Sequence, residues 1–306
     1  MKPFNLLKTA PAALMALGLV GSQAACDFET TGQQLQSSRV MVATVLATPA
    51  IELQPVALVG ADGGFDAGML DLDAGVGFDA DGGTVTLPPQ TLGTIFFGER
   101  DPQSLDAPPT PLTGGQASLT IGDAAPVTLP EKGDGRYEQT SGDDEALAYQ
   151  TGASYVFRVT HRGQTYVGRV DGAPQLEEIP AFHPPKGYIE HTAGQSFTFE
   201  RPAPPQGGER NLGFVNVFPL SDDGERGGPT WSNIPTKPKD FLELISNPGK
   251  FRETQVTVPG SAFPESGKTY LLVMQAVKAG RAESANLFAG SALLAGTAEV
   301  AVFRTR

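Results

Sequence analysis

Residues 135–140 and 152–159 of this chain read GRYEQT and GASYVFRV, and residues 249–254 and 267–274 repeat the plan as GKFRET and GKTYLLVM. Each copy joins a β-type segment, a polar loop and a second segment that Gly-x-(Ser/Thr)-Tyr opens. Alternation in the second segment of the first copy places Tyr155 on one face with every other residue that follows. Strand, loop and strand written twice predict an all-β chain with two tandem β-sandwich domains.

The tyrosines that open the second strands, Tyr155 and Tyr270, carry a family resemblance. Leu147 lies five residues before Gly152, the glycine that opens the second segment of the first copy, and Tyr155 follows Gly152 by three residues. This spacing resembles the tyrosine corner of immunoglobulin and fibronectin type III sandwiches. Asp-Gly-x-Tyr at 134–137 is also similar to carboxypeptidase-regulatory-like sandwiches. The resemblance implies that both corner tyrosines are buried, with each hydroxyl bonded to backbone a few residues upstream.

Residues 1–25 are predicted to be a signal peptide. Lys2 and Lys8 form a positive start, and residues 11–20 form an uncharged apolar run that is too short to span a membrane. No later stretch reaches about 18 uninterrupted apolar residues, so we expect no transmembrane helix. Two cleavages fit: Ser22-x-Ala24 suits an ordinary signal peptidase, and residues 24–26 resemble the lipobox of bacterial lipoproteins.

Cys26 favours the second cleavage because it is the only cysteine and has no intramolecular partner. We therefore predict lipidation of Cys26 and an extracytoplasmic location, either anchored to the outer membrane or as a periplasmic lipoprotein. The chain as a whole resembles tandem-sandwich proteins of bacterial cell envelopes, a group largely without assigned function.

Charge and composition narrow the possible partners. Without Lys2 and Lys8 the chain keeps 20 basic and 34 acidic residues, a net charge of −14. An acidic surface repels phosphate backbones, so we expect no nucleic-acid partner. With 37 glycines, 26 prolines and 18% charged residues, the composition is typical of short strands joined by tight turns.

The predicted organisation follows from these signals. Residues 240–245 have apolar spacing that predicts a short helix. We expect the following segments: a polar tether at 26–38, a first sandwich at 39–174 with an Asp/Gly-rich insert at 60–83, a proline-containing linker at 175–188 and a second sandwich at 189–306.

The insert at 60–83 holds six aspartates and eight glycines without a lysine or arginine. A calcium loop would use such carboxylates, but the EF-hand ligand spacing does not fit. A solvated connector or hairpin is the preferred interpretation, so we predict no metal site here.

No residue pattern in the chain indicates a reaction. The three histidines lack zinc-ligand spacing, and Gly-x-Ser-x-Gly is absent. We therefore predict no enzyme activity, no catalytic residue and no cofactor. Aromatic residues outside the strand pattern, Trp231, Phe182 and Tyr188, are the candidate ligand contacts, because such rings stack on sugars or anchor protein partners. The alternative for Trp231 is that it folds back onto the end of the sandwich.

Two functions remain open at this point. The first is a lipid-anchored, non-catalytic structural or protein-interaction module whose partner is an envelope protein. The second is a carbohydrate-binding module that contacts a polysaccharide through its loop aromatics.

Overall fold

The computed structural model describes residues 28–53, 77–78, 85–104, 106–204, 208–221, 227–235 and 237–306. The predicted signal peptide, Cys26 and all of the 60–83 insert except 77–78 lie outside the described residues.

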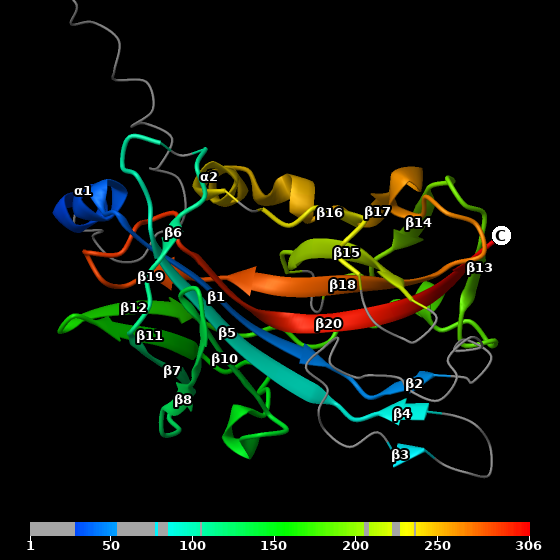
Figure 1. Ribbon diagram of the computed structural model, residues 1–306, viewed down its shortest axis with the longest axis horizontal. Coiled ribbons are helices and arrows are strands. Elements are labelled where there is room, and N and C mark those ends of the chain that lie inside the picture. Colours follow the sequence, from blue (N-terminus) through cyan, green and yellow to red (C-terminus); the bar gives the residue numbers. More distant parts are fainter. Residues whose placement is uncertain are drawn as a thin grey trace, which may run out of the picture.

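Two sheets form the main framework of the described chain (Figure 1). The larger is ten-stranded and has the order β16 (Trp231–Ser232), β15 (Leu212–Leu220), β18 (Thr269–Ala279), β20 (Ala292–Thr305), β1 (Arg39–Thr48), β5 (Gln90–Glu99), β10 (Arg136–Thr140) and β9 (Glu131–Gly133), with β13 (Ile189–His191) on β20 and β6 (Thr110–Pro111) on β5. The second has the order β19 (Arg281–Ala282), β12 (Gln164–Val170), β11 (Tyr155–His161), β7 (Gln116–Ile121) and β8 (Val127–Leu129).

Smaller elements complete the described structure. Two small sheets pair β14 (Phe197–Glu200) with β17 (Gln255–Val258), and β2 (Ile51–Leu53) with β4 (Val85–Leu87) and β3 (Gly77–Phe78). The helices are α1 (Phe28–Gln36), α2 (Pro238–Ser246) and the 3₁₀ turns η4 (Glu145–Leu147), η5 (Pro180–Phe182), η7 (Pro248–Phe251) and η8 (Gly260–Ala262).

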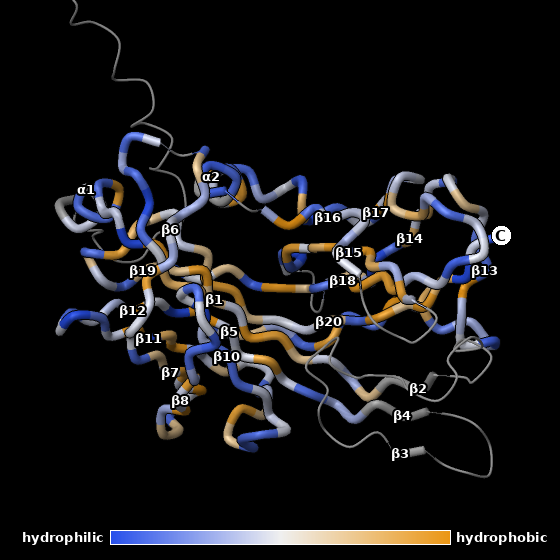
Figure 2. Tube along the Cα trace, viewed as in Figure 1, coloured by the Kyte–Doolittle hydropathy of each residue, from blue (hydrophilic) through white to orange (hydrophobic). Residues whose placement is uncertain are grey.

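The predicted all-β class is confirmed, and the apolar residues form two sandwich cores. The first core lies between the second sheet and the β1, β5 and β10 part of the larger sheet, with Tyr137, Phe157 and Phe97 fully buried. The second core lies where β15, β18 and β20 face β14, β17 and the 3₁₀ turns, and it buries Phe263 and Phe303. Figure 2 shows the hydrophobic stretches on the strands of these two units.

The tandem arrangement takes a form that the sequence pattern did not indicate, because the two cores share the strand β20. Its first residues pair in parallel with β1, from Val42 opposite Ala292 to Ala47 opposite Thr297. The residues toward its end, with Phe303, pack in the second core. In Figure 1, β18 and β20 extend side by side along the long axis of the molecule. The boundaries 39–174 and 189–306 stay predictions, but one sheet runs through both segments.

The repeated stretch adopts similar structure in its second part only. Gly152 and Gly267 have φ of +80° and +73°, a conformation that favours glycine, and β11 and β18 begin just after them. Residues 249–254 do not form the expected strand, since η7 occupies 248–251 and β17 starts at 255. Pro248 at the start of η7 accounts for this difference, because its fixed φ suits the first position of a helical turn.

The segment 26–38, expected as a polar tether, contains the helix α1, which is bonded to the body. The Gln34 side-chain amide donates to the carbonyls of Ala282 and Ser284, both at 3.2 Å. The Arg100 guanidinium donates to the Leu35 carbonyl at 2.8 Å near the C-terminal end of α1. These hydrogen bonds fix α1 on the body. The sequence shows that residues 26–38 are largely polar, but it does not show which partners they bind. The helix expected at 240–245 is present as α2, whose Leu244 packs on the outer face of the larger sheet.

Candidate functional site at the junction of the two cores

A layer of polar side chains separates the two cores along β20. The strand alternates so that Leu293 and Ala295 face the first core, and Ala301 and Phe303 face the second. The residues between them on the same face are Thr297 and Glu299, and both are buried. The segment 175–183 crosses the strand at this level. The junction therefore holds a group of buried polar side chains between two apolar cores.

Glu299 binds the crossing segment through both carboxylate oxygens. Its side chain is 3% exposed, and Oε2 accepts a 2.6 Å hydrogen bond from the Ile179 backbone N–H. Oε1 pairs with Nε2 of His183, whose ring is largely exposed. Burial raises the pKa of the Glu299 carboxyl, and the hydrogen bonds from His183 and Ile179 oppose that rise. Thr297 adds a bond from its hydroxyl to the Gln175 carbonyl at 3.5 Å.

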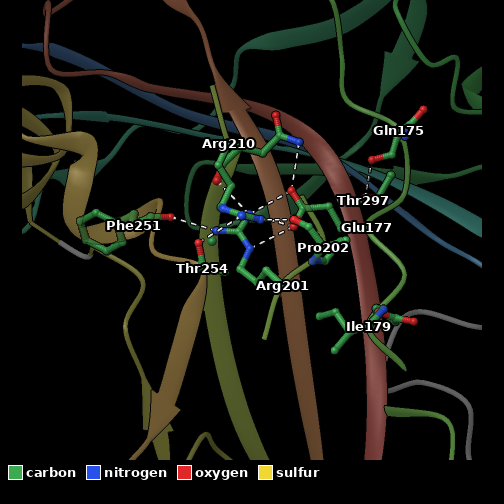
Figure 3. A network of polar contacts seen from close by, with 12 residues as sticks. Gln175, Glu177, Ile179, Arg201, Pro202, Arg210, Phe251, Thr254 and Thr297 are labelled. Carbon is green, nitrogen blue, oxygen red and sulfur yellow. Dashed lines mark hydrogen bonds and ion pairs between the residues drawn. The ribbon is translucent and has the colours of Figure 1, made fainter. Parts of the chain in front are cut away.

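Arg201 and Glu177 form a buried ion pair beside this group (Figure 3). The Arg201 side chain is 0% exposed and that of Glu177 is 11% exposed. Arg201 Nε and Nη2 donate to the two Glu177 oxygens, each at 2.9 Å, a two-point geometry that fixes both side chains. Burial lowers the pKa of the Arg201 guanidinium, and the Glu177 charge opposes that change.

The surrounding backbone completes the hydrogen bonds of the pair. Arg201 Nη2 donates to the Asn211 carbonyl at 2.8 Å, and Nη1 donates to the Phe251 carbonyl at 3.3 Å. The Asn211 side chain donates to Glu177 Oε1 at 3.1 Å. Gly213 permits this arrangement, because a Cβ there would lie 2.7 Å from Arg201 Nη1. All three guanidinium nitrogens are thus in use.

The polar groups of this junction hold the crossing segment 175–183 in place. Two ionisable groups of the crossing segment are paired within the protein: Glu177 with Arg201, directly after β14, and His183 with Glu299 on β20. In the described ranges, no group of three or more histidine, cysteine, aspartate or glutamate side chains is placed to hold a metal ion.

The predicted ligand-contact residues do not form one surface. Phe182 is 4% exposed and meets the Phe199 ring edge-on at 4.9 Å, so it is a core residue. Trp231 is half-buried and packs against the same core. Tyr188 is half-buried and apart from that core, with the Arg304 guanidinium 5.2 Å from its ring centre. Cys26, the predicted lipidation residue, lies outside the described residues.

The two corner tyrosines, Tyr155 and Tyr270, are buried and hydrogen-bonded to backbone. Tyr155 is 0% exposed, and its hydroxyl accepts from the Gln150 N–H at 2.8 Å and donates to the Gln150 carbonyl at 3.3 Å. Tyr270 is 1% exposed, and its hydroxyl accepts from the Glu265 N–H at 3.1 Å. Both bonds reach five residues upstream. Burial raises the pKa of both phenols.

Sequence reasoning missed the junction residues. Glu177 lies in the predicted proline-containing linker at 175–188 and Arg201 in the predicted second sandwich, and neither residue stands in a regular pattern. One signal was available for Glu299: it is the only charged residue between 292 and 303, inside an apolar strand. A single carboxylate in such a run indicates a buried partner.

No helix among the described residues is long and apolar enough to cross a membrane.

Comparisons with known proteins identify no family for this chain. No family model and no curated protein matches it. Among solved structures, the chicken CNTN1 FN1–FN3 domains match at 11% identity over 70% of this chain and 62% of that chain, with a TM-score of 0.21. A chimeric titin Z1Z2-Z1Z2 tandem matches at 13% identity over 71% of this chain and 91% of that chain, with a TM-score of 0.20. Scores this low support no argument, so the β-sandwich assignment rests on the sheets and cores themselves.

Proposed function

We propose that this chain is an exported, lipid-anchored protein of a bacterial cell envelope and acts as a rigid, non-catalytic structural or interaction module. The proposal rests on one observation: a single sheet runs through both cores, and polar side chains hold the crossing segment 175–183 in place. β20 runs along both cores, and the Glu299 carboxylate on β20 and the Glu177–Arg201 pair hold residues 175–183 in place. A body without a hinge between its cores can present a binding surface at a fixed distance from its anchor.

The position of α1 supports the anchoring part of the proposal. The helix begins at Phe28, two residues after Cys26, and Gln34 and Arg100 bond its end to the body. An acylated Cys26 would therefore hold the α1 end of the body close to the membrane surface. Acyl chains contribute about 0.8 kcal/mol per buried CH₂ group, so two or three chains suffice for stable attachment.

The aromatic-based carbohydrate site stays a prediction. Phe182 is buried and Trp231 packs on the second core. Stacking on a sugar ring needs an exposed ring face.

Fractionation and mass spectrometry test the anchor. We expect the wild-type protein in the membrane fraction, with a diacylated N-terminal peptide that starts at Cys26, and the Cys26→Ser variant in the soluble fraction. A wild-type protein that is soluble, with an unmodified N-terminus at Ala25, would overturn the lipoprotein assignment.

Spin-label distances test the rigid body. Labels at the exposed positions Arg162 and Lys268, each changed to cysteine in the Cys26→Ser background, report on the two cores separately. We expect one narrow distance distribution. A broad or bimodal distribution would show that the cores move against each other and would contradict the scaffold role.

A further inference from the structure

A groove of about 550 Å³ lies between the end of α1, the start of β12 and the loop at 285–286. Its lining includes four exposed carboxamide side chains brought together from three separate segments, namely Gln33, Gln36, Gln164 and Asn286. None of these residues belongs to the junction between the cores, and the proposed scaffold role does not use them.

The walls of the groove are held in place by hydrogen bonds. The Ser37 hydroxyl donates to the Asn286 carbonyl at 2.5 Å and joins the helix end to the 285–286 loop. The Tyr166 hydroxyl donates to the Gln164 side-chain oxygen at 2.9 Å and orients that carboxamide. Arg100, buried beneath, donates to the carbonyls of Leu35 and Ser37. The backbone walls and the Gln164 carboxamide are thus positioned before any ligand arrives, which lowers the entropic cost of binding for that part of the groove.

The lining of the groove is close to neutral, whereas the chain as a whole is acidic. Among its described lining residues Arg39 is the one charged group, and Arg39 pairs with Glu99. No carboxylate lines it, although the whole chain carries 34 acidic residues against 22 basic ones. A neutral groove gives neither an anion nor a cation a net attraction. A charged ligand would lose its hydration there without a compensating charge.

Several carboxamide side chains in this neutral groove have donors and acceptors that a ligand could use. The side chains of Gln33, Gln36 and Asn286 have no protein partner in the part of the chain that the structure describes. A carboxamide offers a two-lone-pair acceptor and two donors side by side. Adjacent hydroxyls of a sugar ring have the matching pattern, since each hydroxyl both donates and accepts. The Ser37 and Ser38 hydroxyls in the lining already donate to the Asn286 carbonyl and the Glu99 carboxylate and accept from Arg39, so the open capacity lies in the carboxamides.

We propose that this groove binds a neutral oligosaccharide through its carboxamides. The proposal goes beyond the scaffold role and supplies a ligand class for an interaction module. It differs from the aromatic-based alternative in its residues, because Tyr166, the ring in the groove, is only 2% exposed and offers no stacking face. Recognition therefore relies on hydrogen bonds to ring hydroxyls.

The test uses the purified, detergent-solubilised wild-type protein on an array of immobilised neutral and anionic oligosaccharides, with titration calorimetry on each glycan that binds. The test variant is Gln33→Ala/Gln36→Ala, because both side chains are exposed and removing them breaks no internal bond. Gln116→Ala is the matched control, an exposed glutamine on β7 outside this groove. Thermal midpoints check that all three proteins are equally folded.

We expect binding to at least one neutral glycan, a loss of tenfold or more in affinity in the double variant, and wild-type affinity in Gln116→Ala. Binding to anionic glycans alone, no binding at all, or equal loss in the variant and the control would each overturn the proposal. The Cys26→Ser protein enters the same assay. Retained glycan binding in soluble Cys26→Ser separates the groove from the anchor, so either proposal can fail while the other stands.

Discussion

Removal of the charge of Glu177 should destabilise the protein far more than the same change at the surface. Glu177→Gln keeps the size of the side chain but leaves the Arg201 guanidinium, 0% exposed, without its counter-ion. Breaking a buried ion pair from one side costs about 3–5 kcal/mol, because the remaining charge has lost both water and partner. With a urea m-value of about 3 kcal/mol/M, the unfolding midpoint should fall by roughly 1 M or more.

Urea denaturation followed by fluorescence and circular dichroism measures this change. Trp231 is the only tryptophan and packs on the second core, so its emission reports that core, while circular dichroism reports all sheets. Because one sheet runs through both cores, we expect the two probes to give coincident transitions in the wild-type protein.

Glu209→Gln is the matched control for this substitution. It makes the same chemical change at a pair with Arg252 in which the Glu209 side chain is 79% exposed. Exposed pairs contribute about 0–1 kcal/mol, so the control should shift the midpoint little. Equal effects of Glu177→Gln and Glu209→Gln would refute the view that the buried pair fastens the crossing segment.

Three further outcomes follow from the structure. Burial raises the pKa of Glu299 in the folded state, so the folded protein binds this proton more tightly than the unfolded chain does. The contribution of Glu299 to stability therefore falls as pH rises above its ordinary value of 4.5, and denaturation at several pH values should show Glu299→Gln gaining on the wild type in that range; a pH-independent difference would contradict this. Tyr155→Phe leaves the Gln150 N–H unpaired and should lower the free energy of unfolding by about 1–3 kcal/mol, measured in urea, whereas an unchanged midpoint would refute a structural corner bond. Gly280 lies in the turn between β18 and β19, and Gly280→Ala places a methyl group against the Arg169 carbonyl oxygen. This change should lower the free energy of unfolding by about 1–3 kcal/mol, and a neutral effect in thermal unfolding would show that the turn can relax.

The sequence by itself determined the features that depend on neighbouring residues. Alternation of apolar side chains indicated the β class and the strand that starts at Tyr155, and i, i+3, i+4 spacing indicated α2. The resemblance to a tyrosine corner implied a backbone hydrogen bond for each tyrosine, and in the structure each bond reaches only five residues upstream. These signals are local, so they survive in a single sequence.

Only the tertiary structure decided how the distant segments combine. The parallel pairing of β1 with β20 joins residues about 250 positions apart, as Val42 opposite Ala292 shows, and a strand pattern does not name its partner. The pairing of Glu177 with Arg201 and the carboxamide groove at α1 arise in the same way. Polar residues in loops look alike in sequence whether they face water or a buried partner. The difference lies in desolvation, which the fold imposes once its sheets have closed.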